Sequence, residues 1–434
     1  MRGLARGRKS TNDRRMGQDS AHRSGTGSLS RPHPREAELR EHIAGRRGAL
    51  LSDLKLQVET ATGGGFTPGL DRTREHIAKR LRALGASIEL VAGEARPSWL
   101  YGAAGAGDIP PVLVARRPGR AGATRVLISG HLDTVHDPDG PFRALTIGED
   151  GTTATGPGCV DMKGGLVIAI HALESLHALG IECAWMVVLN SDEETGSYHS
   201  EAALRAIARE ADVGLVLEPA LPDGSLVVER PGSGQFVIEC GGKSAHVGRD
   251  FAEGKSAVLA LARCIVATGG MSDPAASRIV NIGPIEGGRA TNVVPDSARA
   301  WGNARFGTPE IAAAIERDLR ALETSAGAIP SVRVEVSFNR PAKPLTPGTE
   351  RLALAARSVA ESLGQKLPFG KTGGVCDGNI LQDAGLATID TLGVRGGGLH
   401  TPREWIELAS LVERCQLLAI LVARLSGDGG WRRG

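Results

Sequence analysis

The sequence predicts an α/β fold in which a mainly parallel sheet, with helices on both faces, is interrupted by a smaller βαββαβ unit. Short apolar segments alternate with amphipathic segments over residues 71–217, which is the order of strands and helices around a parallel sheet. The order changes to βαββαβ over residues 226–338. The length of 434 residues also exceeds what one compact core commonly holds, so two units are expected.

The elements of the first unit follow from hydrophobic periodicity. Leu166, Ile170 and Leu173 recur at helical spacing, and Gly85 follows an earlier helical pattern as a typical stop. The short apolar runs have the length of buried strands. The expected strands are residues 126–130, 185–190 and 213–217. The expected helices are residues 71–85, 164–180, 350–363 and 410–425.

The inserted unit has the order of a split βαβ layout, which predicts a ferredoxin-like antiparallel sheet with two helices on one face. Three prolines, Pro341, Pro344 and Pro347, mark the return to the first unit. The expected strands are residues 226–240, 278–284, 297–306 and 331–338. The expected helices are residues 254–268 and 309–326.

These patterns divide the chain into segments. Residues 1–35 are rich in Ser, Gly and Arg without a hydrophobic period, so they are expected to be a disordered basic tail. The first unit then occupies residues 36–225 and 341–428, the inserted unit occupies residues 226–340, and a short tail occupies residues 429–434.

Composition and charge exclude several classes of protein. Hydrophobic residues make up 41% and charged residues 23%, which is ordinary for a globular enzyme. No apolar run approaches the roughly 20 residues of a membrane helix. Residues 36–434 carry 42 basic and 47 acidic side chains, a net charge of −5, so nucleic-acid binding is not expected of them. The tail is open to three interpretations: a solvated extension, a misplaced start before Met16, or a contact with RNA.

Six cysteines are scattered along the chain without a CxxC pair, which argues against a disulfide framework or a cysteine zinc site. An apolar secretion signal is absent from the N-terminal sequence. A reducing cytoplasm is therefore the expected location.

Acids and histidines recur where the predicted parallel strands end, and ligands bind at that edge of such sheets. His131 and Asp133 follow the strand at 126–130, in the arrangement of a metal ligand and its orienting carboxylate. Asp161 lies in a glycine-rich loop that opens the helix at 164–180. That loop has neither of the common phosphate-binding spacings, and a carboxylate there favours a cation.

Three further groups follow the same rule. Asp192, Glu193 and Glu194 end the strand at 185–190, where adjacent acids repel one another unless a cation or proton relieves them. Glu218 ends the strand at 213–217, and His400 follows a run of three glycines. Each group alone is equally explained as a surface turn. Together they provide enough His, Asp and Glu ligands for two metal sites that share one Asp. This ligand set without Cys suits Zn²⁺, with Co²⁺ or Mn²⁺ as alternatives, and two such ions can activate one water.

These segments, in this order over residues 40–425, resemble the zinc-dependent peptidase and deacylase family M-twenty, which includes aminoacylase, acetylornithine deacetylase, succinyl-diaminopimelate desuccinylase and glutamate carboxypeptidase. The resemblance implies that His131, Asp161 and Glu218 bind one metal. It implies that Glu194, His400 and a bridging Asp161 bind the other. Asp133 would orient His131, Glu193 would be the general base, and the Asp161–Met162 peptide bond would be cis.

The inserted unit resembles the lid and dimerisation domain of that family, which implies a homodimer. By this resemblance His246 reaches the partner's active site and steadies the developing oxyanion, with help from Asn292. Arg305 would pair with a substrate carboxylate. Each residue also has a purely structural interpretation: a turn for His246 and Asn292, and a charge on a strand face for Arg305.

The implied function is a two-metal hydrolase that cleaves an amide or peptide bond next to a free carboxylate, and residues 373–379 and the loop of His400 look most like the glutamate carboxypeptidase branch. Two residues depart from that branch. Ser or Thr is commoner at the position of Cys376, and Ser is commoner at the position of Thr401. An N-acyl amino acid deacylase is the alternative. A catalytically silent protein that binds amino-acid derivatives is a third hypothesis.

Overall fold

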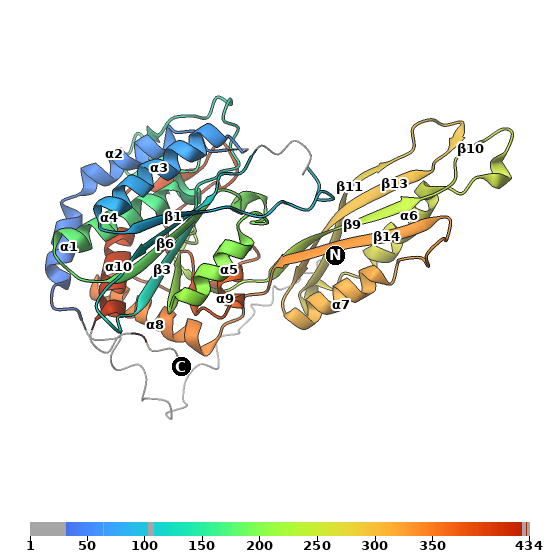
Figure 1. Ribbon diagram of the computed structural model, residues 1–434. Coiled ribbons are helices and arrows are strands. Elements are labelled where there is room, and N and C mark those ends of the chain that lie inside the picture. Colours follow the sequence, from blue (N-terminus) through green and yellow to red (C-terminus); the bar gives the residue numbers. More distant parts are fainter. Residues whose placement is uncertain (1–31, 64, 103–107, 428–430, 432–434) are drawn as a thin grey trace, which may run out of the picture.

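The computed structural model describes residues 32–63, 65–102, 108–427 and 431. Residues 1–31 of the expected basic tail, and all of the expected 429–434 tail except Trp431, lie outside the described residues. The described chain forms two bodies that lie side by side (Figure 1). The chain enters the smaller body where β9 (Gly232–Gly241) begins and leaves it where β14 (Ser331–Arg340) ends.

The larger body is built on a six-stranded sheet with the order β1-β2-β6-β3-β7-β16. The strands β6, β3, β7 and β16 are parallel, whereas β2 is antiparallel to β6 and β1 is antiparallel to β2. This confirms the predicted mainly parallel sheet. The strands are β1 (Ser87–Val91), β2 (Val112–Arg117), β3 (Arg125–His131), β6 (Ala184–Asn190), β7 (Val213–Val216) and β16 (Thr388–Ile389).

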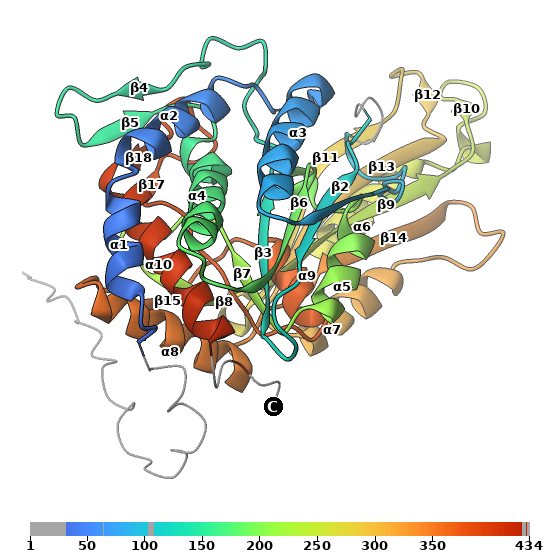
Figure 2. The same cartoon turned by 60° about the vertical axis from the view of Figure 1, so that its left-hand side comes forward.

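Helices cover both faces of this sheet because its central strands are apolar on both sides. Ile128 belongs to the core beneath α4 and α10, whereas its neighbour Leu127 belongs to the core beneath α5 and α9. Figure 2 shows these two helix layers on opposite sides of the sheet. The helices of this body are α1 (Glu36–Ala44), α2 (Arg47–Val58), α3 (Thr67–Ala83), α4 (Gly164–Ala178), α5 (Glu201–Glu210), α8 (Pro347–Ser362), α9 (Asp377–Asp383) and α10 (Ala409–Ser426). Among the described residues, we find no helix with the length and apolar character that a membrane crossing needs.

Two small sheets bring distant loops of the larger body together. One has the order β17-β18-β5-β4 and places the segment after residue 395 beside the segment before residue 159. The other pairs β15 with β8 in parallel. Their strands are β4 (Thr146–Ile147), β5 (Thr153–Thr155), β8 (Leu226–Glu229), β15 (Phe369–Lys371), β17 (Gly396–Gly397) and β18 (Trp405–Glu407).

The smaller body, which we call the lid unit, is an antiparallel sheet with the order β11-β13-β9-β14. Helices α6 and α7 pack against it around the buried residues Phe236, Ile238 and Phe306. Its elements along the chain are β9 (Gly232–Gly241), α6 (Ala257–Gly269), β11 (Arg278–Gly287), β13 (Ser297–Phe306), α7 (Pro309–Arg320) and β14 (Ser331–Arg340). This is the predicted βαββαβ order.

The single strand expected over residues 226–240 is divided in the structure, so that expectation was wrong. Residues 226–229 form β8 and pair with β15 of the larger body, and β9 begins only at Gly232. The break falls at Arg230 and Pro231, where proline has no N–H to continue a ladder. At the other crossing, β14 extends to Arg340, two residues beyond its predicted end.

Candidate metal centre

Three of the five predicted metal ligands lie at the carboxyl ends of parallel strands, and the other two lie on loops beside the small sheet β17-β18-β5-β4. His131 is the last residue of β3, and Glu218 comes two residues after β7. Asp161 lies in the turn Cys159–Lys163 (η1) that leads into α4, and Glu194 lies in the turn Glu193–Thr195 (η2) after β6. His400 lies on the loop between β17 and β18. Because parallel strands end at one edge of the sheet, the strand-end residues converge there, and the pairing of β18 with β5 brings the loops of Asp161 and His400 together.

Asp161 stands between the two histidines. Its Oδ1 lies 3.3 Å from His131 Nε2, and its Oδ2 lies 3.6 Å from His400 Nε2. Glu218 Oε1 lies 4.0 Å from His131 Nε2, and Glu194 Oε2 lies 3.3 Å from His400 Nε2. The five side chains thus form two groups that share Asp161, which is the arrangement of a bridging carboxylate.

The donor atoms at this centre fit a metal. His131 Nε2, Asp161 Oδ1 and Glu194 Oε1 are buried polar atoms without a hydrogen-bond partner in the protein. Ligand atoms of these three residues lie within 4.8 Å of one another. Buried polar groups are almost always partnered, so orphaned atoms that converge on one point indicate a cation between them.

The electrostatics of the cluster agree with this. Burial, reinforced by the neighbouring Glu193 and Asp161 carboxylates, raises the pKa of Glu218 well above its usual range. Burial also raises the pKa of Glu194. Hydrogen bonds to Asp161 and Glu194 raise the pKa of His400 to about 10. These shifts are those of carboxylates crowded into a small volume, where a bound cation would relieve the repulsion.

Asp133 connects the His131 loop to the turn that carries the two adjacent glutamates. Its carboxylate accepts hydrogen bonds from the backbone N–H of Glu193 (3.2 Å) and of Glu194 (2.9 Å). His131 Nδ1 lies 2.9 Å from the Asp133 carbonyl oxygen and 3.4 Å from Oδ1. Asp133 therefore fixes the side of the His131 ring that faces away from the cluster, which leaves Nε2 free for a ligand.

Sequence reasoning missed Arg340, which holds the predicted general base. Its Nη2 lies 2.7 Å from Glu193 Oε1 and donates to the Glu193 backbone carbonyl (2.6 Å) and to Ser197 Oγ (2.8 Å). Arg340 is the last residue of β14 and is buried. The sequence signal that could have found it is a basic residue directly before Pro341, where the chain leaves the lid unit.

Arg305 lies on the same side of the lid sheet as Arg340. Both residues pair with Ser233 of β9 in register, one from β13 and one from β14, and directly paired residues point to the same face. Two strand spacings, about 10 Å, separate their backbones. Arg305 Nε donates to Asn303 Oδ1 at 3.1 Å, while its Nη1 is buried without a partner. Burial lowers the pKa of Arg305, as expected for a cation that lacks a counter-ion.

His246 and Asn292 lie together, but the structure does not bring them to the metal ligands of the same chain. The N–H of Val247 donates to the Asn292 carbonyl (3.0 Å), and the short strands β10 (Ala245–His246) and β12 (Val293–Val294) pair. This strand pair stands at the end of the lid unit that points away from the larger body (Figure 1). Both side chains are exposed.

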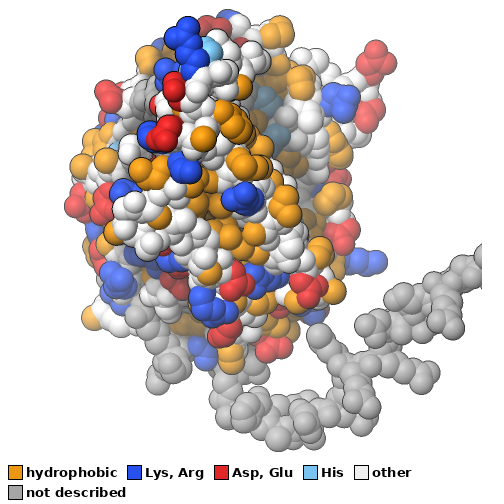
Figure 3. Space-filling model, turned by 90° about the vertical axis from the view of Figure 1, so that its right-hand side faces the viewer, with side chains coloured by type: hydrophobic (Ala, Val, Ile, Leu, Met, Phe, Trp, Pro, Cys, Tyr) orange, Lys and Arg blue, Asp and Glu red, His pale blue; other side chains and the backbone are white. Residues whose placement is uncertain are grey.

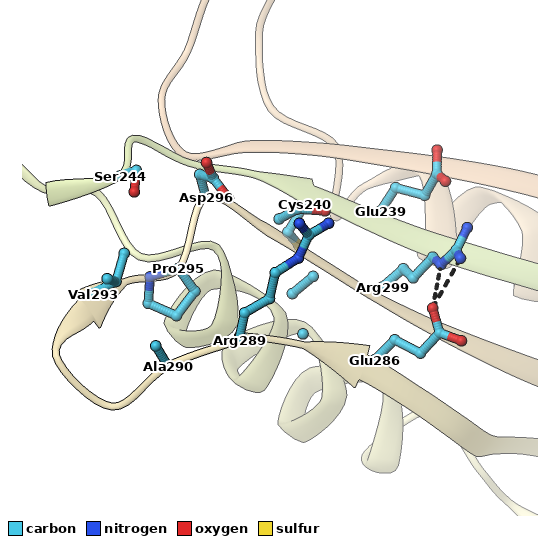
Figure 4. Close-up of a pocket in the computed structure, with 14 residues that line it drawn as sticks. Glu239, Cys240, Ser244, Glu286, Arg289, Ala290, Val293, Pro295, Asp296 and Arg299 are labelled. Carbon is cyan, nitrogen blue, oxygen red and sulfur yellow. Dashed lines mark hydrogen bonds and ion pairs between the residues drawn. The ribbon is translucent and has the colours of Figure 1, made fainter.

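A pocket of about 810 Å³ lies beside the β10–β12 strand pair in the lid unit (Figure 4). Ser244 and Val293, near His246 and Asn292, form part of its wall, and Arg289 extends into it. On the opposite wall Arg299 pairs with Glu286 at 2.8 Å. The described residues that line this pocket include no predicted metal ligand, so it is separate from the metal centre.

Residues 127–424 match the Peptidase family M20/M25/M40. The chain belongs to this family. The match covers the lid unit and most of the larger body, and it begins after α1, α2, α3, β1 and β2. The family resemblance of the motifs is therefore confirmed, and the protein is a hydrolase related to metallopeptidases.

Relatives with names fall into two groups. The chain is 27% identical to carboxypeptidase G2 of Pseudomonas sp. (strain RS-16) over 390 residues, which cover 87% of this chain and 89% of that enzyme. It is 28% identical to the succinyl-diaminopimelate desuccinylase of Methylorubrum populi over 366 residues, which cover 80% of this chain and 91% of that enzyme.

Solved structures of M20 peptidases share the fold. A tripeptidase from Staphylococcus aureus superposes with a TM-score of 0.68 at 23% identity, covering 87% of this chain and 99% of that one. A dinuclear metal-binding M20 peptidase from Bacillus subtilis superposes with a TM-score of 0.62 at 16% identity, covering 88% of this chain and 99% of that one.

Two remaining features of this M20 site concern its backbone and its thiols. The Asp161–Met162 peptide bond is cis, as the resemblance implied. Cys159 and Cys376, which fall within the site motifs, are free and buried. Burial raises the pKa of both thiols, which favours the neutral form that packs as a small apolar side chain.

Proposed function

We propose that this chain is a two-metal hydrolase that cleaves an amide or peptide bond next to a free carboxylate, in the manner of a glutamate carboxypeptidase. The observation that carries the proposal is Arg305. Its buried and unpartnered Nη1 lies on the face of the lid sheet from which Arg340 reaches Glu193. Arg305 is half-buried and lacks a counter-ion, so a substrate carboxylate that pairs with Nη1 would remove an unfavourable desolvation.

The proposed metal ligands are His131, Asp161 and Glu218 for one ion, and Glu194, His400 and the same Asp161 for the other. Their donor set suits two Zn²⁺ ions, with Co²⁺ or Mn²⁺ as alternatives. When bound, such a pair polarises the scissile carbonyl and acidifies a water molecule.

Glu193 is the proposed general base, and the residues around it explain how it serves. Arg340 fixes one carboxylate oxygen of Glu193, and Asp133 fixes the backbone of the same residue. The free oxygen can take a proton from water and later give it to the leaving amine. The geometry therefore holds the base in one position while a substrate enters beside the lid unit.

A homodimer is the proposed assembly, because the lid unit exposes an apolar strip and carries His246 away from its own metal centre. Val258, Leu259 and Val266 of α6, together with Ile279 and Ile285 of the edge strand β11, are exposed. Figure 3 views the molecule from the lid end and shows hydrophobic side chains gathered there among charged ones. A second copy that covers this strip would satisfy the open strand edge. His246 would then serve the partner's site.

The six cysteines support a reducing compartment, and we propose the cytoplasm. All six are free and buried in the structure.

The test of function is amine release by Zn²⁺- or Co²⁺-loaded protein from a matched panel. The panel contains dipeptides and N-acetyl, N-succinyl, N-carbamoyl and aminobenzoyl amino acids, each with and without a chelator. Release that the chelator abolishes, fastest with dipeptides or aminobenzoyl-glutamate, supports the carboxypeptidase proposal. Fastest release from N-acetyl or N-succinyl amino acids selects the deacylase, which the desuccinylase relatives favour.

Absence of release across the panel, from protein shown to contain two metal ions per chain, would contradict both hydrolase assignments. The hypothesis of a protein that only binds amino-acid derivatives would then be the better one.

A further inference from the structure

Glu404 is a buried carboxylate beside the metal centre, and the sequence motifs do not draw attention to it. It follows His400 by four residues, on the same loop, and directly precedes β18. Only 1% of its surface is exposed. A buried carboxylate is unfavourable unless its oxygens are fully hydrogen-bonded, so its partners show which groups it holds.

Three of those partners are backbone N–H groups of the turn that carries Asp161. Glu404 Oε1 accepts from Val160 (2.8 Å) and Asp161 (3.0 Å), and Oε2 accepts from Gly158 (2.9 Å). Gly158 has a φ of +70°, and a Cβ there would lie 2.5 Å from a methyl group of Thr134. The turn is thus wrapped around the Glu404 carboxylate, and glycine at 158 provides both the positive φ and the close approach to Thr134 that this conformation needs.

The fourth partner comes from the loop that carries His131. His136 Nε2 lies 2.5 Å from Glu404 Oε2. The His136 ring also packs edge-on against Phe142, with ring centres 5.2 Å apart. The backbone carbonyl of Glu404 accepts a hydrogen bond from the N–H of Gly156 (3.1 Å). Glu404 therefore joins three loops, and each of them supplies a residue of the metal centre.

We propose that Glu404 is a positioning residue that sets the relative placement of His131, Asp161 and His400, and with it the spacing of the two metal ions. The proposal rests on the metal-ligand roles given above. Its physical basis is that one carboxylate accepts hydrogen bonds from the Asp161 turn and from His136 on the His131 loop. The loop of Glu404 itself carries His400. Removing the carboxylate leaves the buried N–H groups of the Asp161 turn without acceptors, so the turn must shift to find water.

The variants that test this are Glu404→Ala, Glu404→Gln and the control Glu407→Ala. Glu407 lies on the same segment, but its half-buried carboxylate pairs with Arg395 at 2.7 Å and contacts neither the Asp161 turn nor a metal ligand. Gln keeps one oxygen that can accept from Val160 and Asp161, but its amide group cannot accept from Gly158. It therefore restores part of the arrangement.

Two measurements need no substrate: the Zn²⁺ dissociation constant by competition with a chromophoric chelator, and the visible absorption spectrum of the Co²⁺-loaded protein. We expect Glu404→Ala to weaken Zn²⁺ binding about 10- to 100-fold and to alter the Co²⁺ spectrum. The Gln variant should fall between Ala and wild type, and Glu407→Ala should match wild type. With the best substrate of the panel, kcat should fall by a similar factor while KM stays within about threefold, because the lid arginines are untouched.

Wild-type Zn²⁺ affinity and a wild-type Co²⁺ spectrum in Glu404→Ala would overturn the proposal. If the Ala variant shows no cooperative thermal unfolding, the Gln variant decides: weaker Zn²⁺ binding with a changed spectrum supports the proposal, and unchanged values overturn it. Failure of the proposed hydrolase function appears differently, as wild-type protein that binds two metal ions and cleaves nothing.

Discussion

At the scale of single residues, Glu193 is held by contacts to both its side chain and its backbone. One carboxylate oxygen contacts Arg340, and the backbone N–H donates to Asp133. These contacts would pre-position Glu193 for its proposed role as general base.

Replacing Glu193 with Gln keeps the size and the contact with Arg340 but removes the proton acceptor. We expect kcat to fall at least about 100-fold, because that is the lower range for loss of a general base. Metal content and thermal stability should stay near wild type. Steady-state kinetics together with metal analysis check this, and near-wild-type turnover would falsify the role of Glu193.

Arg305 is expected to select substrates by their carboxylate. Arg305→Met should lower kcat/KM about 10- to 100-fold, as expected for loss of a charge-assisted hydrogen bond. A substrate whose carboxylate is blocked as an amide should be cleaved equally by the variant and by wild type. The control is Arg299→Met on the same strand, where the exposed guanidinium pairs with Glu286. Equal losses on free and blocked substrates would show that Arg305 acts on the fold and not on the carboxylate.

At the scale of elements, a buried ionic cluster ties α2, α3 and α4 together behind the sheet. Asp53 of α2 contacts Arg80 of α3 and lies 3.2 Å from His171 Nε2 of α4. Burial alone would raise the pKa of Asp53, but hydrogen bonds to His171 and Arg80 outweigh it and lower the pKa from 3.8 to about 2. This network joins helices that sequence periodicity identified only in part.

Asp53→Asn should lower the free energy of unfolding by about 2 kcal/mol near neutral pH, because it weakens the charged hydrogen bonds to Arg80 and His171 while Glu174 still pairs with Arg80 at 2.8 Å. The control Glu75→Gln, from an exposed pair with Arg82 on the same helix as Arg80, should change it by less than about 1 kcal/mol. Since the folded-state pKa of Asp53 lies below its usual value of 3.8, its stabilisation is complete above pH 3.8 and is lost as the pH falls toward 2. The difference between wild type and Asp53→Asn, measured by denaturant titration, should shrink in that window. A difference that is independent of pH would contradict the assignment.

At the scale of the whole molecule, the position of His246 makes a prediction about mixed dimers. If His246 serves the partner's site, Glu193→Gln and His246→Ala homodimers are both impaired at every site. A mixed dimer, however, contains one site with an intact Glu193 and an intact His246 from the other chain. After complete subunit exchange of equal amounts, about a quarter of wild-type activity should return.

Differently tagged chains allow the mixed dimer to be isolated and its activity measured directly. Recovery in the isolated mixed dimer supports a shared site. If mixed dimers form but recover nothing, His246 acts within its own chain, whereas a His246→Ala homodimer with wild-type activity would show that His246 has no role. Two wild-type proteins carrying the same tags provide the control for exchange.

The fold class could be read from the sequence because its signals are local. Strand and helix periodicities depend on neighbours within one element, and they correctly predicted the parallel strands β3, β6 and β7 and the βαββαβ order of the lid unit. The sequence patterns did not predict the helices α1 and α2. They predicted one strand over residues 226–240, where the structure has the two strands β8 and β9. There the deciding factor is tertiary pairing, since β8 joins a strand from residues 369–371.

The sequence by itself indicated which residues could bind metal, because acids clustered at strand ends repel one another and are unfavourable without a cation. Only the tertiary structure decided how they are held. Arg340 and Glu404 lie in segments without a recognisable motif, 147 and 243 residues away from the groups they fix. Hydrogen bonds between residues so distant along the chain depend on the whole packing, and no local pattern encodes them.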